Sequence, residues 1–306
     1  MLTTLDPVSI AATASPEVLR SSRWEPLRDR HVARVGAWVG PHLERRRAGT
    51  AHPVEDFLFT YYSFRPAALA RWHPGFGFAL EGGEEYAGLK GYADLGGAMG
   101  VTREHVAGHR PLLSSVHDLL TATAARPGSF GCFGMHEWAM VYRLPPEGVR
   151  HAAWPLRLGA SGTDEVVESH RIACSHFDAF RFFTEPARPR NSLQPGRDDR
   201  VAFEQPACLH AGMDLYKHAF RLTPMVPSEL VADCFELARD IRVLDMRASP
   251  YDLSGLGYEP VRVETPEGKQ EYVAAQRAFA ERAAPLRAGL IAECERLLDA
   301  SSAAGG

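Results

Sequence analysis

The sequence predicts a mainly α-helical protein with a small β element, folded as a single compact helical domain. Several long segments repeat apolar residues at the three- and four-residue spacing of an amphipathic helix. Glycines gather in residues 74–100, where helical spacing is lost. No internal repeat or low-complexity linker divides the 306 residues, and an apolar content of 45% can fill one core without disulfide or metal support.

The first helix is expected over residues 24–47. Leu27, Val35 and Val39 lie near helical spacing there, and the charged run 44–47 predicts a solvated end.

A second helix is expected to begin at His52-Pro53, because proline suits a first helical position. Leu58 and Tyr61 then share one face of it. The glycine-rich residues 74–100 follow and fit turns or short strands, so the β element is expected there.

Helical spacing returns over residues 105–125 and ends at Pro127-Gly128. A turn then leads into another helix, with His136 and Glu137 near its start. Residues 154–184 mix β-branched and aromatic residues and fit either strand or helix, whereas the proline- and arginine-rich residues 186–200 predict a loop.

Three further helices are expected in the C-terminal third. Residues 209–222 place His210 and Asp214 one turn apart on one face. An apolar stripe then runs from Leu230 to Leu244, with Ser228 as the expected N-cap. The last helix is expected over residues 269–298.

The chain start lacks the basic region and apolar run of a secretory signal, and no stretch reaches the roughly 18 apolar residues of a membrane span. The five cysteines are scattered, with no CxxC pair. We therefore expect a soluble, cytoplasmic protein. Residues 1–22 are expected to be a flexible tail, residues 23–299 one catalytic domain, and residues 300–306 a disordered tail.

The formal net charge of −4 gives no general attraction to nucleic acid phosphates. Any DNA affinity is expected to be weak and to depend on a local arginine patch formed by Arg188, Arg190, Arg197 and Arg200.

Histidines paired with carboxylates indicate a possible metal centre. His176-Phe-Asp178 followed by His210 has the order of iron sites built from two histidines and one carboxylate. His136-Glu137 matches the start of the zinc-protease HExxH helix, but Met140 replaces the second histidine and excludes that class. His136, His176 and His210 are the candidate ligands of Fe²⁺ or Zn²⁺, and a hydrogen-bonded His176–Asp178 pair is the alternative.

Aromatic residues are dense between residues 57 and 73. They exceed what one helix face needs for packing, so some could hold a flat heterocycle between rings. A phenylalanine-rich core remains the other interpretation. The candidate substrate-binding residues are Tyr61, Tyr62, Arg65, Trp72, Trp138 and Arg181.

Several segments carry a resemblance to a known family: HPVEDFLFTYYSFRPAALARWHPG, GMHEWAMVYR, SHFDAFRFFT and CLHAGMDLYKHAFRLTPMVPSEL. Over roughly residues 24–299 the chain resembles a bacterial family usually labelled 3-methyladenine DNA glycosylase. The resemblance implies an N-glycosylase, a hydrolase of DNA repair, whose substrate is an alkylated or modified nucleobase in a nucleoside or in damaged DNA. No helix-hairpin-helix element with its following aspartate is recognisable, so no catalytic residue is transferred from it.

Such a reaction needs a carboxylate that stabilises an oxocarbenium-like sugar or positions water. Asp178, Asp214 and Glu137 are the candidate catalytic residues. A metal-dependent oxidoreductase or hydrolase, built on the three candidate histidine ligands, is the alternative function.

Overall fold

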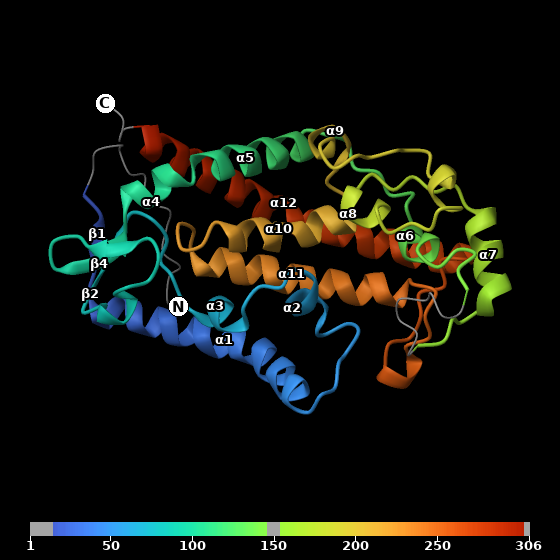
Figure 1. The fold of residues 1–306 in the computed structure, drawn as a ribbon, viewed down its shortest axis with the longest axis horizontal. Helices are drawn as coiled ribbons and strands as arrows, with labels where there is room; N and C mark the ends of the chain where they lie inside the picture. The colour runs from blue at the N-terminus through green and yellow to red at the C-terminus, as the bar shows by residue number, and fades with distance from the viewer. Residues whose placement is uncertain (1–14, 146–153, 303–306) are drawn as a thin grey trace.

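The computed structural model describes residues 15–145 and 154–302 and confirms the mainly α-helical fold with a small sheet. Helices α5 (Arg110–Ala124), α10 (Leu209–Arg221), α11 (Ser228–Arg247) and α12 (Pro266–Ser302) run along the long axis of the molecule (Figure 1). The sheet lies at one end of this bundle. Helix α7 (Gly159–Ser169) and several loops lie at the other end.

The remaining elements are short, apart from α1. They are α1 (Ser21–Arg47), α2 (Phe57–Tyr61), α3 (Pro66–Ala70), α4 (Arg103–Gly108), α6 (Met135–Ala139), α8 (Phe177–Phe180), α9 (Arg200–Phe203), β1 (Glu17–Leu19), β2 (Phe78–Glu81), β3 (Tyr92–Asp94), β4 (Ala98–Val101) and the 3₁₀ turns Glu84–Tyr86, Arg188–Arg190 and Ser254–Leu256.

The core forms where α10 packs against α11. Leu215 on α10 and Leu237 and Ile241 on α11 are almost completely buried. Gly212 lets the two helices approach closely, because a Cβ atom built there would lie 2.8 Å from Cδ1 of Ile241. The apolar stripes read from the sequence are therefore the buried faces of these helices.

The small sheet has the strand order β1-β2-β4-β3, and β2, β3 and β4 come from the predicted residues 74–100. Strand β1 pairs in parallel with β2, with Leu19 opposite Leu80. The expectation of a flexible tail up to residue 22 is therefore wrong for residues 15–22, because Leu19 is buried in the cluster beneath the sheet. Residues 1–14 lie outside the described part of the chain.

The helix expected from His52 is shorter than predicted. Turns occupy residues 53–56, α2 spans only Phe57–Tyr61, and Ser63 has a positive φ of 56° before α3 begins at Pro66. A left-handed residue and a proline both interrupt a helix.

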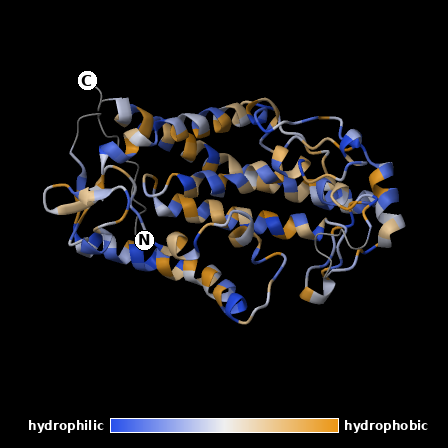
Figure 2. Cartoon of the chain, in the orientation of Figure 1, coloured by the Kyte–Doolittle hydropathy of each residue, from blue (hydrophilic) through white to orange (hydrophobic). Residues whose placement is uncertain are grey.

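Other expectations have mixed outcomes. Residues 154–184 contain two helices, α7 and α8, rather than a continuous strand. Helix α11 begins at Ser228, but the serine hydroxyl accepts the backbone N–H of His73 instead of capping its own helix. The charged end of α1 is exposed as expected and appears blue in Figure 2.

The last helix continues beyond the predicted end. Helix α12 runs to Ser302, and the Arg110 guanidinium donates hydrogen bonds to the Leu298 carbonyl and the Ser301 hydroxyl. Residues 300–302 are thus helical rather than disordered, and residues 303–306 lie outside the described chain. Among the described residues, no helix combines the length and apolarity needed to span a membrane.

Two glycines of α12 provide a test of this packing. A Cβ atom at Gly268 would lie 1.9 Å from the backbone oxygen of Arg262, whereas one at Gly289 would make an ordinary 3.6 Å contact with Leu230. We expect Gly268→Ala to lower the free energy of unfolding by about 1–3 kcal/mol or more. Gly289→Ala should be neutral or stabilising by up to about 1 kcal/mol. Urea unfolding of both variants checks this, and equal stabilities would contradict the close approach at Gly268.

Candidate functional site

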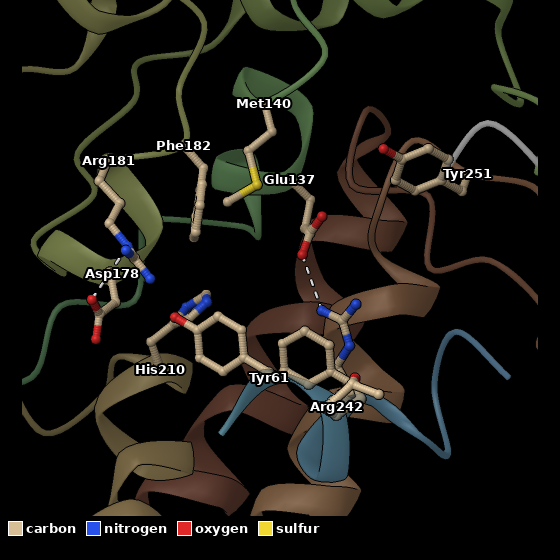
Figure 3. A pocket seen from close by; sticks show the side chains of 11 residues that line it. Tyr61, Glu137, Met140, Asp178, Arg181, Phe182, His210, Arg242 and Tyr251 are labelled. Carbon is tan, nitrogen blue, oxygen red and sulfur yellow. Dashed lines mark hydrogen bonds and ion pairs between the residues drawn. The ribbon is translucent and has the colours of Figure 1, made fainter. Parts of the chain in front are cut away.

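A pocket of about 420 Å³ opens where α2, α6, α8, α10 and α11 converge. Its walls mix aromatic and charged side chains, which is typical of a site for a small organic ligand. The lining residues are Phe57, Thr60, Tyr61, Glu137, Met140, Asp178, Arg181, Phe182, His210, Arg242 and Tyr251. Figure 3 shows Asp178 and Arg181 at one end and Glu137 with Arg242 toward the other.

A tight backbone turn before α6 sets the direction in which this helix enters the pocket wall. Phe133 and Gly134, which precede the helix, both have positive φ, at 48° and 68°. This conformation is costly for phenylalanine, so the surrounding packing must hold it. The turn leads directly into α6, whose His136 and Glu137 are both buried.

A buried network of charged groups connects α6 to α11. His136 Nε2 lies 2.8 Å from Asp245 Oδ1, and Arg242 Nη1 donates to Asp245 Oδ2 at 2.8 Å. The same Arg242 nitrogen donates to Glu137 Oε1 at 3.0 Å. Each charge therefore has an opposite partner, which burial requires.

The network shifts the protonation of its members. Burial alone would raise the pKa of Asp245, but His136 and Arg242 hold that pKa well below its ordinary value. Burial opposes the charged form of His136 as well, yet the neighbouring Asp245 carboxylate raises the pKa of His136 well above its usual range. Without a further ligand, the pair is an imidazolium bound to a carboxylate.

Asp214 on α10 is the centre of a second network. Its carboxylate accepts hydrogen bonds from Tyr62 at 2.8 Å, Arg200 at 2.7 Å and Lys217 at 2.8 Å. Lys217 also donates to Asp178 at 3.1 Å, and so joins the buried Asp214 to the pocket wall. Burial would raise the pKa of Asp214, but the neighbouring His176 side chain and the charge of Lys217 keep it well below its ordinary value.

The ring of His210 contacts one histidine beside each of the two networks. Its ring centroid is 4.5 Å from that of His136 and 5.3 Å from that of His176. Burial, followed by the charge of His136, lowers the pKa of His210 well below its ordinary value, so its imidazole is neutral. A neutral imidazole that faces a pocket can accept a proton or bind a metal ion.

The structure brings together five residues that the sequence singled out. Tyr61, Glu137, Asp178, Arg181 and His210 all line the pocket. Tyr61 stays a neutral phenol because burial raises its pKa.

Four candidates lie beside the pocket rather than on its wall. Asp214 is buried, and it holds Tyr62 behind the pocket by accepting the hydrogen bond of the tyrosine hydroxyl. His136 and His176 are buried, and the rings of both contact that of His210.

Three predicted substrate-binding residues do not line the pocket. Trp72 stacks on Trp24 beneath the sheet, with ring centroids 6.3 Å apart. Trp138 is buried in the core and donates its indole N–H to the Ala248 carbonyl. Arg65 is exposed and precedes α3. The aromatic density around residue 72 therefore reflects packing, which was the other interpretation.

Sequence reasoning missed Phe57, Phe182, Arg242 and Tyr251 as pocket residues and did not single out Asp245. One signal was available, because position 245 follows Ile241 by four residues and so lies on the buried stripe of α11. A carboxylate on such a stripe needs a buried partner. Phe57 belongs to the aromatic-dense segment already noted, and the other three positions carry no comparable signal.

No family model matches the chain, and neither the curated proteins nor the solved structures contain a match.

The two linked carboxylates should respond differently to neutralisation. Asp178 is partly exposed, so Asp178→Asn should change the free energy of unfolding by less than about 1 kcal/mol. Asp214 is buried with three donors, so Asp214→Asn should cost about 3–5 kcal/mol by leaving cations uncompensated. Chemical denaturation of both variants measures the contrast. Equal losses would contradict the described difference in burial.

His218 should contribute to acid sensitivity. Burial lowers its pKa from 6.5 to about 3, so between those values the unfolded chain binds a proton that the folded protein does not. Stability from this group is complete above pH 6.5 and falls as the pH drops, by about 1.4 kcal/mol per pH unit. In His218→Gln, the free energy of unfolding should fall less steeply as the pH drops from 6 to 4, by about 1.4 kcal/mol per pH unit. His117→Gln, on the half-exposed face of α5, is the control, and an unchanged slope in His218→Gln would contradict the assignment.

Proposed function

We propose that the protein is a hydrolase that cleaves the N-glycosidic bond to an alkylated or modified nucleobase. The observation that carries this proposal is the composition of the pocket, in which aromatic rings form the walls and carboxylates stand at both ends (Figure 3). This arrangement suits a flat ring joined to a sugar, because the ring needs stacking and the sugar needs negative charge as the bond breaks.

Ring binding would use the stacked pair Phe57 and Tyr61, whose centroids are 5.0 Å apart and whose planes differ by 10°. Phe182 projects into the pocket above Tyr61 (Figure 3). Arg242 packs its guanidinium 3.7 Å from the Phe57 ring centroid, which fixes that ring. A cavity of about 420 Å³ is large enough for a base with part of its sugar.

Cleavage would use Asp178 as the carboxylate beside the sugar. Lys217 and Arg181 hold this carboxylate in place at 3.1 Å and 3.4 Å. As the bond between the sugar carbon and the base nitrogen breaks, the negative charge stabilises the oxocarbenium-like sugar. Water then adds to the sugar carbon, and the proton that it loses passes to the Asp178 carboxylate. An alkylated base that already carries positive charge leaves readily.

A nucleoside or a short single-stranded substrate fits the charge distribution better than duplex DNA. The net charge is −4, and two members of the proposed arginine patch are engaged within the protein. Arg200 pairs with Asp214, and Arg190 donates to the Tyr142 hydroxyl. This patch therefore has fewer free guanidinium groups for phosphate contacts.

Release of free base from N3- and N7-alkylated purine nucleosides and oligonucleotides, followed by chromatography, tests this function. Asp178→Asn should lower the rate by about a hundredfold or more while leaving the fold intact. Asp118→Asn, an exposed acidic residue on α5, is the matched control. The proposal is wrong if no alkylated substrate releases its base, or if Asp178→Asn and the parent protein are equally fast.

Tyr61→Ala should weaken binding of the released base by about 1–3 kcal/mol, because a stacking surface is lost. Tyr61→Phe should retain most of the affinity, since the ring remains. Fluorescence titration with the alkylated base measures both variants, and identical affinities in Tyr61→Ala and the parent would place the base elsewhere.

A further inference from the structure

We propose that His136, His210 and Asp245 bind one divalent transition-metal ion, Zn²⁺ or Fe²⁺, at the floor of the pocket. Each residue offers one ligand atom, and these three atoms all lie within 4.8 Å of one another. Ligands placed about 2.0–2.2 Å from a common ion lie at most about 4.4 Å apart, so small side-chain adjustments suffice.

The ligand set has the chemistry of known metal sites. Two imidazoles and one carboxylate bind zinc in hydrolases and iron in non-haem oxygenases, and both classes leave coordination positions open. The three ligands come from α6, α10 and α11, so separate helices fix their positions. A site supported by the core in this way is rigid.

The open side of the site would face the pocket. His210 is the ligand that lines the pocket, and its ring centroid lies 4.5 Å from that of His136. An ion held between its imidazole and Asp245 would therefore be accessible to a ligand in the pocket. Bound water at that position would become a nucleophile near neutral pH.

One of the proposed ligands, Asp245, is held by a hydrogen bond from a neighbouring side chain. Arg242 donates to Oδ2 of Asp245, which leaves Oδ1 for the ion. Metal ligands are usually oriented by such outer hydrogen bonds.

His176 is a further buried imidazole beside the proposed site. Its side chain is completely buried, yet neither ring nitrogen has a hydrogen-bond partner. Its nearest carboxylate oxygens, on Glu204 and Asp214, are 3.4 Å and 3.5 Å away. Its ring centroid lies 5.3 Å from that of His210, so His176 is a buried polar neighbour of the proposed site.

Metal binding does not depend on the identity of the substrate, whereas delivery of the attacking water by the ion rests on the proposed function. Binding should therefore be measured without substrate. Protein purified without a polyhistidine tag and stripped with a chelator is titrated with Zn²⁺ by calorimetry and with Co²⁺ by absorption spectroscopy. We expect one ion per chain and a cobalt spectrum without a thiolate charge-transfer band, because the ligand set contains no cysteine.

His210→Ala should weaken Zn²⁺ binding by about a hundredfold or more. His117→Ala, which removes a partly exposed imidazole able to bind metal adventitiously, should leave the affinity unchanged. The proposal is overturned if the parent protein does not bind Zn²⁺, if His210→Ala binds like the parent, or if a thiolate band shows that a cysteine is a ligand. If His210→Ala fails to fold, the cobalt spectrum of the parent protein still tests the ligand set, because it shows whether a thiolate is bound. Tight metal binding without base release would refute the proposed hydrolase and leave the metal site intact.

Discussion

The position of Asp245 constrains the rest of the site. A carboxylate that is 0% exposed cannot remain charged without partners, and His136 and Arg242 provide them from α6 and α11. Helix α6 has only five residues, too few to be stable alone, so this charged contact and the packing of Trp138 hold it on α11. The orientation of Glu137 toward the pocket follows from the same contact.

Asp214 has a corresponding role on the other side of His210. Its three donors come from α9, α10 and the segment after α2, so one buried charge holds together parts of the chain that are distant in sequence. Lys217 extends this network to Asp178 at the pocket wall. The two buried carboxylates thus support the site without lining it, while the partly exposed Asp178 and the neutral His210 face the ligand space. This division separates groups that maintain structure from groups available for chemistry.

The long helices and the sheet region could be predicted because their patterns are local. The stripe from Leu230 to Leu244 repeats over several turns, and glycine-rich residues 74–100 exclude a helix. The pocket could be predicted only in part, since Trp72 and Tyr61 carry the same aromatic signal and only tertiary packing separates a core ring from a pocket ring. The contact of His136 with Asp245 joins residues 109 positions apart, and no spacing rule reveals such a pair.

A crystal structure of the protein with a bound alkylated adenine tests the central claim most directly, namely that the aromatic pocket between Asp178 and Glu137 is the ligand site. The structure described here predicts that the base stacks between Tyr61 and Phe182, with the nitrogen that would carry the sugar directed toward Asp178. A base bound at another surface, with this pocket unoccupied, would contradict the claim.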